Sequence, residues 1–361
     1  MRSCEAPAVP LLSATADVPT PALVADLGAV TRNVERAAVW FGSGRVRLRP
    51  HFKAHKCTRL LRLQCASGGC TGVTCATAHE AEVLALAGFT DILLANEVAD
   101  PGGLAALKRA ASVEGVRVTA CVDDRRHVAM LGALGVALDV LVEVDVGQHR
   151  CGVAPGEALA LARVVAGTER LRFRGLQGYE GHAVLLPERE RRADEVMIAA
   201  RILHAERAAL EAAGLACELV SGGGTGTFDL STQAGALDEI QAGSYVLMDA
   251  SYGKLGLSFE QALFCRATVV SRQGTRLVLD AGLKALSAEY GMPSARHPGV
   301  EVLSLADEHA TARVAASSTL AVGDAILLVP AHVDPTVNLH AALHMVAADG
   351  TVEAWAVDGR R

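Results

Sequence analysis

Short β-rich runs alternate with helix-forming stretches from residue 45 to about residue 250, and this alternation constrains the fold more than any other feature of the chain. It is the signature of βα units that surround a parallel sheet. We count eight units, which predicts an α/β fold with a closed (β/α)8 barrel of the TIM type in place of an open doubly wound sheet. The expected strands are residues 46–52, 71–76, 91–96, 116–122, 139–146, 172–179, 217–223 and 239–245.

The pattern changes after Tyr252. Four later segments combine short strands with Gly, Asp and Asn turns and contain no helical stretch, at residues 263–282, 311–316, 324–330 and 344–359. Such segments are typical of an antiparallel β domain. We therefore predict a barrel over residues 20–255 and a C-terminal antiparallel β domain over residues 256–361, to which residues 1–19 also contribute.

The composition excludes several classes of function. Apolar residues make up 51% of the chain, charged residues 20%, and the net charge is −6, so neither a disordered chain nor a nucleic-acid-binding protein is expected. Nine cysteines without metal-finger spacing indicate reduced thiols in the cytoplasm. We expect no membrane span, because no run of about 20 apolar residues occurs. The N-terminal stretch is too weakly apolar for a secretion signal.

The stretch "RPHFKAHK" (residues 49–56) ends the first expected strand and is the first candidate for chemistry. A solvated basic edge would explain such a cluster without any function. In a barrel, however, functional groups lie at the carboxyl ends of the strands, and Lys53 falls at such an end. His51, His55 and Lys56 crowd this lysine, which suits a nucleophilic amine. Lys53 is therefore the candidate catalytic lysine, with His51 as a candidate neighbour in a cofactor site.

The glycine-rich stretch "SGGGTGT" (residues 221–227) follows the seventh expected strand. Successive glycines let backbone N–H groups approach an anion, and barrels commonly bind a phosphate after strands seven and eight. A reactive lysine and a phosphate cradle on one barrel rim together point to pyridoxal 5'-phosphate. The candidate phosphate contacts are Ser221, Gly223, Gly224, Thr225 and Gly226, with Tyr245 in "AGSY" as a second wall.

Two further loops contain groups that suit such a cofactor. Arg150, in "EVDVGQHRCG", would be a fixed cation near the cofactor ring, although a surface arginine after a turn fits the pattern equally well. In "GLQGYEGH", Tyr179 would pack against the ring and His182 would carry a proton. Both are also consistent with ordinary loop residues.

The segment "PAHVDPTVNLH" (residues 330–340) contains a possible half of a metal site. His332 and Asp334 are two residues apart, so on a strand they would project from the same face. One imidazole and one carboxylate suit a hard or borderline divalent cation. A His-x-Asp pair is also common by chance.

Eight motifs together resemble the D-threonine aldolase and D-serine dehydratase family of pyridoxal-phosphate enzymes, which share the alanine-racemase-type barrel. The resemblance runs in order from about Thr20 to Trp355. It implies that Lys53 bonds to the cofactor, that Arg150 lies beside it and that residues 221–227 with Tyr245 bind its phosphate. It also implies that His332 and Asp334 bind a metal. The motifs are "TPALVADLGAVTRN", "RPHFKAHK", "TCATAHEAE", "DVGQHRCGV", "SGGGTGT", "GSYVLMD", "LDAGLKALS" and "HVDPTVNL".

The metal motif bears on the reaction that the resemblance implies. Dehydratases of this family typically carry His-x-Cys with zinc, whereas the aldolases typically carry His-x-Asp with manganese or another divalent ion. Asp334, a hard oxygen donor, therefore favours the aldolases and Mn²⁺, with Mg²⁺ or Zn²⁺ as alternatives. One position departs from the aldolases, which have a histidine six residues after the position of Tyr179. This chain has Leu185 there.

The expected function is metal-dependent retro-aldol cleavage of a D-configured β-hydroxy-α-amino acid to glycine and an aldehyde. The resemblance implies a homodimer in which the β domain of one subunit completes the barrel site of the other. The alternative is a dehydratase of the D-serine or D-3-hydroxyaspartate type that releases ammonia and a keto acid, which Leu185 favours and Asp334 disfavours. The residues after Tyr252 weigh against a simple cofactor carrier, and alanine racemase needs no metal.

Overall fold

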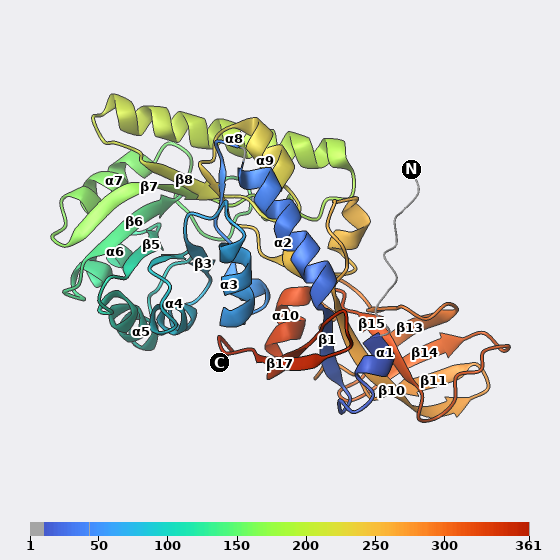
Figure 1. Cartoon of the computed structure of the whole chain (residues 1–361). Helices are drawn as coiled ribbons and strands as arrows, with labels where there is room; N and C mark the ends of the chain where they lie inside the picture. The colour runs from blue at the N-terminus through green and yellow to red at the C-terminus, as the bar shows by residue number, and fades with distance from the viewer. Residues whose placement is uncertain (1–10, 43, 361) are drawn as a thin grey trace. The chain divides into compact units, whose positions relative to one another are not determined.

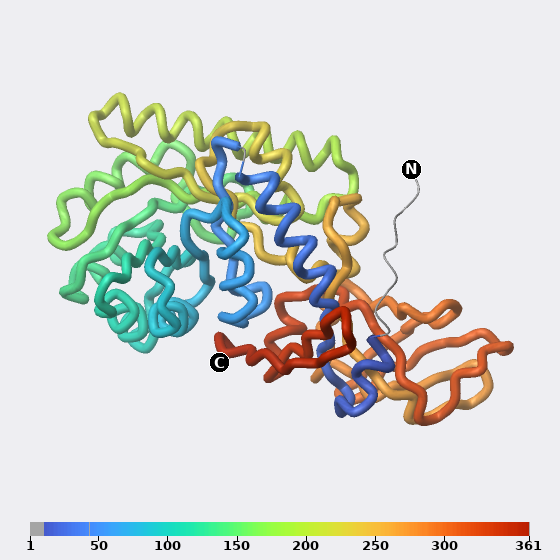
Figure 2. Tube along the Cα trace, viewed as in Figure 1, coloured from blue at the N-terminus to red at the C-terminus, as the bar shows by residue number. Residues whose placement is uncertain are grey.

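The computed structural model describes residues 11–42 and 44–360 (Figure 1, Figure 2). Contacts divide these residues into two compact units. The barrel unit contains residues 37–53 and 60–243, and the β unit contains residues 11–36, 54–59 and 244–360. No helix among the described residues is long and apolar enough to cross a membrane.

Eight parallel strands form the sheet of the barrel unit, in the order β2-β9-β8-β7-β6-β5-β4-β3. Isolated bridges from Leu48 to Cys70 and from His51 to Thr74 join the two ends of this order and close the ring. The predicted barrel with eight strands is therefore confirmed. The strands are β2 (Arg47–Leu48), β3 (Val73–Cys75), β4 (Asp91–Leu94), β5 (Arg117–Val122), β6 (Leu138–Glu143), β7 (Leu171–Gly178), β8 (Leu219–Gly222) and β9 (Glu239–Ile240).

Helices separate successive strands of the barrel unit, as the sequence alternation predicts. Several begin at a residue whose side chain caps the first turn: Thr77 accepts from the N–H of Glu80, and Asp100 accepts from that of Gly103. The longest helix of the described residues is α8. The helical elements of the barrel unit are α4 (Ala78–Leu86), α5 (Pro101–Ala111), α6 (Arg125–Gly132), α7 (Ala158–Ala166), α8 (Arg189–Ala212) and α9 (Phe228–Ala234). Three further elements have residues in both units: α2 (Leu27–Gly42), η1 (Phe52–Ala54) and α3 (Thr58–Ala66).

The interior of the barrel combines an apolar cluster with a buried ion pair. Leu93, Cys121, Leu141 and Leu219 come from four different strands and pack together. Arg49, which is 1% exposed, donates from Nε to Glu239 at 2.7 Å and from Nη1 to Asp91 at 3.0 Å. Buried charges of this kind are stable only when they are paired and hydrogen-bonded.

Nine strands form the mixed sheet of the β unit, with the main order β13-β14-β11-β10-β1-β16-β17, while β15 pairs with β10 and β12. The pairs are antiparallel except for β1 and β16, which run parallel. The strands are β1 (Ala22–Asp26), β10 (Leu263–Gln273), β11 (Arg276–Leu279), β12 (Ser294–Ala295), β13 (Val300–Leu305), β14 (Ala310–Val314), β15 (Ala325–Val329), β16 (Ala342–Val346) and β17 (Val352–Ala356). The helical elements are α1 (Leu11–Ala14), η2 (Ser244–Val246), η3 (Tyr252–Leu255) and α10 (Val333–Asn338).

The β unit departs from the predicted organisation at two places. Residues 22–26 lie within the range predicted for the barrel, but they form strand β1, which pairs with β10 through Leu23 and Cys265 and with β16 on its other side. Helix α10 lies in a segment that we expected to contain strands and turns only. The division of the chain at residue 255 stays a prediction, and residues 1–10 of the expected N-terminal contribution lie outside the described residues.

The eight cysteines in the described part of the chain are free thiols. Several are deeply buried in the barrel strands, including Cys75 and Cys121. Burial raises the pKa of both thiols well above the ordinary value, so they remain protonated at neutral pH. They behave as small apolar side chains of the core.

Candidate active site

Two of the predicted cofactor residues lie over the ring of a third, Tyr179. Lys53 lies in η1, directly after β2, and its Nζ atom is 5.8 Å from the centre of this ring. The guanidinium carbon of Arg150, in the loop after β6, is 5.9 Å from the same centre. Tyr179 itself follows β7. All three residues therefore lie at the carboxyl ends of strands, where barrel sites form.

His51 holds the turn that carries Lys53. Its ring is buried, and its Nδ1 accepts from the backbone N–H of Lys53 at 3.4 Å. Its own backbone N–H donates to the carbonyl of Ala242 at 3.1 Å, next to β9. These contacts fix where the lysine side chain begins. A direct contact between His51 and a cofactor stays a prediction.

The glycine-rich loop lies tightly against the segment that follows β7. A Cβ atom on Gly226 would fall 1.8 Å from the carbonyl oxygen of Val184, and one on Gly224 would be 3.4 Å from the ring of Tyr179. Gly223 has a φ of +73°, which a residue with a side chain rarely adopts. The repeated glycine therefore has a geometric cause: the backbone must approach both Tyr179 and Val184 closely.

Two hydroxyl groups that seemed suited to phosphate binding face inward instead. Ser221 belongs to β8, and its Oγ donates to Glu239 at 2.7 Å and accepts from Gln241 at 2.8 Å. The Oγ1 of Thr227 donates to Glu180 at 2.8 Å. Because a hydroxyl carries a single proton, neither side chain has one left for a phosphate. The predicted cofactor contact of Ser221 would therefore have to come from its backbone atoms, and it stays a prediction.

Glu143 is a buried carboxyl group beside Arg150 that the sequence analysis did not select. It ends β6, and its Oε1 is 3.9 Å from the Nη2 of Arg150. Gln177 donates to its Oε2 at 2.5 Å. Burial, reinforced by the charge of Glu97, raises the pKa of Glu143 to about 8. A charged residue inside the apolar run "DVLVEVDV" was the signal that could have revealed it.

Two further carboxyl groups and a thiol lie close together at the same rim of the barrel. Glu97, Asp123 and Cys151 place ligand atoms within 4.8 Å of one another, in the loops after β4, β5 and β6. Burial, together with Glu97, raises the pKa of the Cys151 thiol to about 11, so it is protonated at neutral pH. Asp123 accepts from the N–H of Gly152 at 2.9 Å. This contact braces the loop that carries Arg150.

His182, the predicted proton carrier, lies in the turn after Tyr179. Its ring packs on Gly147, where a Cβ atom would be 2.9 Å from Cε1. Its Nε2 is 3.3 Å from Glu195 of α8. Leu185, which stands where the resemblance implies a histidine in the aldolases, is partly buried. The catalytic role of His182 stays a prediction.

The proposed metal ligands of the β unit lie at the start of α10. His332 is the N-cap residue with an extended backbone, and Asp334 is in the first turn. The expected strand geometry is therefore wrong, but the two side chains still meet: Nε2 of His332 is 3.7 Å from Oδ1 of Asp334. Ser244 donates to the same Oδ1 at 3.2 Å.

Surrounding groups hold this imidazole in place. The Nδ1 atom of His332 is 2.8 Å from Oε2 of Glu289, and the ring of Tyr290 stacks at 4.5 Å. The contact with Glu289 orients the ring so that Nε2 is the nitrogen on the side of Asp334. Asp249 accepts from the N–H of Val333 at 2.9 Å and so fixes the backbone between the two ligands. Tyr245, in the same unit, is buried against Phe259.

Both sets of residues fit the groups that the resemblance implies. The 3.7 Å between Nε2 and Oδ1 is spanned by one cation at about 2.0–2.2 Å from each, and the nitrogen–oxygen donor set suits Mn²⁺, Mg²⁺ or Zn²⁺. In the barrel unit, the amine of Lys53, the ring of Tyr179 and the close glycine backbone match the aldehyde, ring and phosphate of pyridoxal phosphate.

Comparisons with known proteins agree with this geometry. The alanine racemase N-terminal domain family matches residues 25–251, and a serine dehydratase domain family matches residues 262–346. The chain is 40% identical to a D-threonine aldolase of Arthrobacter sp over 358 residues, covering 96% of this chain and 93% of that protein. It is 36% identical to a 3-hydroxy-D-aspartate aldolase of Paracoccus denitrificans (strain Pd 1222), covering 98% and 95%.

A solved structure is similar over the same extent. The crystal structure of D-threonine aldolase from Filomicrobium marinum superposes with a TM-score of 0.91 at 41% identity, covering 96% of each chain. This likeness includes the barrel and the β strands that follow it.

Proposed function

We propose a retro-aldol activity from one premise: this chain belongs to the alanine-racemase-type family that includes the D-threonine aldolases. The substrate is a D-configured β-hydroxy-α-amino acid, and the products are glycine and an aldehyde. The reaction uses pyridoxal 5'-phosphate and a divalent cation, for which Mn²⁺ is the first candidate. The similarity to proteins named D-threonine aldolase and 3-hydroxy-D-aspartate aldolase supports this substrate class.

One observation carries the choice of reaction: a carboxylate, Asp334, faces the imidazole of His332 at 3.7 Å. A hard oxygen donor at this position suits a hard divalent cation, and in this family it is typical of the aldolases. When bound, the cation would act as a Lewis acid toward the β-hydroxyl group of the substrate. Glu289 and Ser244 orient the two ligands, through the contacts of 2.8 Å and 3.2 Å described above.

The barrel residues bind and orient the cofactor. Lys53 holds its aldehyde through the ε-amine, Tyr179 packs on the ring and Arg150 places a fixed cation at the ring edge. The backbone of Gly224, Thr225 and Gly226 would bind the phosphate, while the N–H of Gly223, also a predicted contact, donates to Glu180 at 3.2 Å. The cofactor supplies the sink for the electron pair that the breaking Cα–Cβ bond releases. The protein contributes by holding the Cα–Cβ bond perpendicular to the plane of the cofactor ring, where it overlaps with the π electrons.

His182 is the proposed proton acceptor for the β-hydroxyl group. Its Nε2 contacts Glu195, and this carboxylate would stabilise the imidazolium that forms. The role is a proposal that the sequence position suggests. A homodimer and a cytoplasmic location also remain proposals, supported by the family and by the free thiols of the described residues.

A dehydratase of the D-serine or D-3-hydroxyaspartate type is the second candidate. Leu185 favours it, because the aldolases of the family carry a histidine there. Product analysis distinguishes the two reactions. Purified protein with the cofactor and Mn²⁺ is incubated with D-threonine, D-serine and D-phenylserine. Glycine with an aldehyde supports the aldolase, and ammonia with a keto acid supports the dehydratase.

A further inference from the structure

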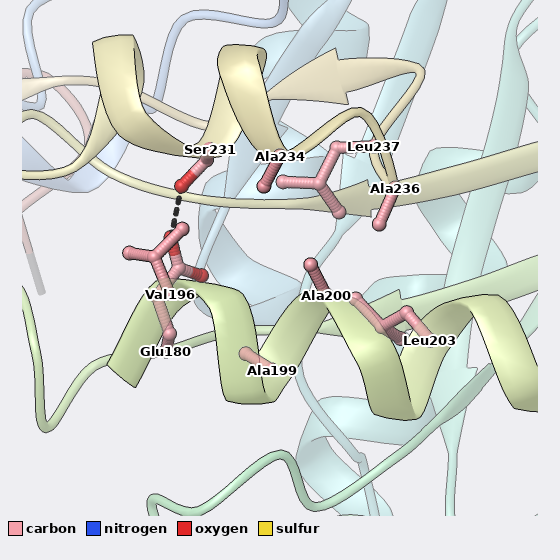
Figure 3. A pocket seen from close by; sticks show the side chains of 9 residues that line it. All are labelled: Glu180, Val196, Ala199, Ala200, Leu203, Ser231, Ala234, Ala236 and Leu237. Carbon is pink, nitrogen blue, oxygen red and sulfur yellow. Dashed lines mark hydrogen bonds between the residues drawn. The ribbon is translucent and has the colours of Figure 1, made fainter. Parts of the chain in front are cut away.

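Glu180 is a buried carboxylate directly after Tyr179, and the glycine-rich loop supplies two of its partners. Its side chain is 2% exposed. Oε1 accepts from the hydroxyls of Thr227 at 2.8 Å and Ser231 at 2.6 Å, while Oε2 accepts from the N–H of Gly223 at 3.2 Å. Figure 3 shows the carboxylate pointing to Ser231 of α9, above Val196 and Ala199 of α8.

All three donors to this carboxylate are neutral. The side chains around the small cavity beside it are alanine, valine and leucine, apart from Ser231 (Figure 3). A buried carboxyl group in such surroundings is costly unless hydrogen bonds satisfy it. The hydrogen bonds from Gly223 and Thr227 are therefore strong constraints on the backbone that carries them.

The two loop residues that Glu180 binds stand at opposite ends of the candidate phosphate cradle. Gly223 begins the buried turn after β8 with its φ of +73°, and Thr227 ends it as the N-cap of α9. The backbone between them, residues 224–226, is thus held at both ends. It is also pressed against Val184 and Tyr179, as the contacts of Gly226 and Gly224 show.

Glu180 also links this loop to the ring site. Its chain neighbour Tyr179 contacts Gly224 and lies 5.8 Å from Nζ of Lys53. A change that frees the carboxylate would therefore loosen the phosphate cradle without removing any group that touches the cofactor. This separates a positioning role from a binding role.

We propose that Glu180 is a positioning residue that preorganises the loop of residues 223–227 for the phosphate group of the cofactor. The inference rests on the proposed function, because it assumes that this loop receives a phosphate. A preformed anion site binds more tightly than one that must be ordered on binding, since the ordering cost is met during folding. Glu180 thus acts on phosphate affinity through Gly223 and Thr227.

The test compares two ligands that differ only in the phosphate. Cofactor-free protein is titrated with pyridoxal 5'-phosphate and with pyridoxal, and absorbance reports binding of each. The variants are Glu180→Ala and the milder Glu180→Gln, which keeps one acceptor oxygen. The matched control is Glu190→Gln, an exposed carboxylate ten positions further along on α8. Circular dichroism checks that each variant is folded.

We expect both Glu180 variants to weaken pyridoxal phosphate binding by about tenfold or more, which corresponds to about 1.4 kcal/mol. Binding of pyridoxal should change by less than about twofold, and the control should match the unmodified protein. Equal weakening of both ligands, or no change in either, overturns the inference. If the unmodified protein does not prefer the phosphorylated ligand, the proposed cofactor site itself is wrong, and the inference falls with it.

Discussion

The Nζ atom of Lys53 lies 5.8 Å from the centre of the Tyr179 ring. These residues follow β2 and β7, and Arg150 reaches the same ring from the loop after β6. An amine, an aromatic face and a guanidinium therefore converge at one rim of the barrel. This convergence is the basis for placing the cofactor there.

Replacing Lys53 with alanine should abolish covalent cofactor attachment. After incubation with pyridoxal phosphate and reduction with borohydride, mass spectrometry of the unmodified protein should show one cofactor bound at Lys53. Lys53→Ala should show none, because no other amine lies at that position beside Tyr179 in the described structure. Lys56→Gln, in the same segment, is the control and should retain the adduct. Labelling of Lys53→Ala at an unchanged level would refute the assignment.

Removing the metal should stop turnover but leave the cofactor bound. His332 and Asp334 belong to the β unit, whereas Lys53 belongs to the barrel unit. EDTA, or Asp334→Ala, should lower the rate by more than about 100-fold, because the Lewis acid contributes several kcal/mol. The visible absorbance of the cofactor should persist. Asp307→Ala, an exposed position, serves as the control. Full activity in a metal-free sample would exclude a catalytic metal.

Replacing His182 with alanine tests the proton acceptor. We expect a rate loss of roughly 100-fold to 10,000-fold, the usual range for a general acid or base, with cofactor and Mn²⁺ affinity retained. His204→Ala, on the exposed side of α8, should have no effect. A loss of less than about tenfold, equivalent to about 1.4 kcal/mol, would remove His182 from the mechanism.

The buried carboxyl of Glu143 predicts a pH dependence of stability. Its pKa is about 8 in the folded protein, whereas that of an unfolded glutamate is about 4.3. The folded state therefore binds a proton that the unfolded state releases, so stability falls as the pH rises from about 5 to about 8, by up to about 1.4 kcal/mol per pH unit. Glu143→Gln stays neutral and keeps an acceptor for Gln177, so it should flatten this dependence.

Urea unfolding between pH 5 and pH 9 measures the effect. Glu169→Gln, whose side chain is 90% exposed, is the control and should follow the unmodified protein. An unchanged pH slope in Glu143→Gln would mean that the carboxyl is ionised in the folded state at neutral pH.

The sequence predicted those parts of the fold that depend on local pattern. The strand expected at residues 116–122 forms as β5 (Arg117–Val122), because its run of β-forming residues is a local pattern. Strand β1 was not among the expected strands, because its pairing with β10 and β16 depends on contacts far along the chain. Helix α10 was missed because its six residues include Pro335 and several β-branched side chains, which do not favour a helix.

The candidate site shows the same division. Lys53, Arg150 and Tyr179 were found from motifs at strand ends, and the structure brings them together. The sequence did not reveal the inward direction of the Ser221 and Thr227 hydroxyls. Nor did it reveal that Glu289 contacts His332, or that Glu180 accepts hydrogen bonds from the glycine-rich loop. These contacts depend on which side chains meet in three dimensions.

The central claim is that Cα–Cβ cleavage, and not loss of water, is the reaction. A D-configured 3-hydroxyaspartate tests it most directly, because both reactions can consume this one compound. Retro-aldol cleavage gives glycine and glyoxylate, whereas dehydration gives ammonia and oxaloacetate. With pyridoxal phosphate and Mn²⁺ present, we expect glycine and glyoxylate in equal amounts, matching the substrate consumed. Ammonia and oxaloacetate as the main products would contradict it.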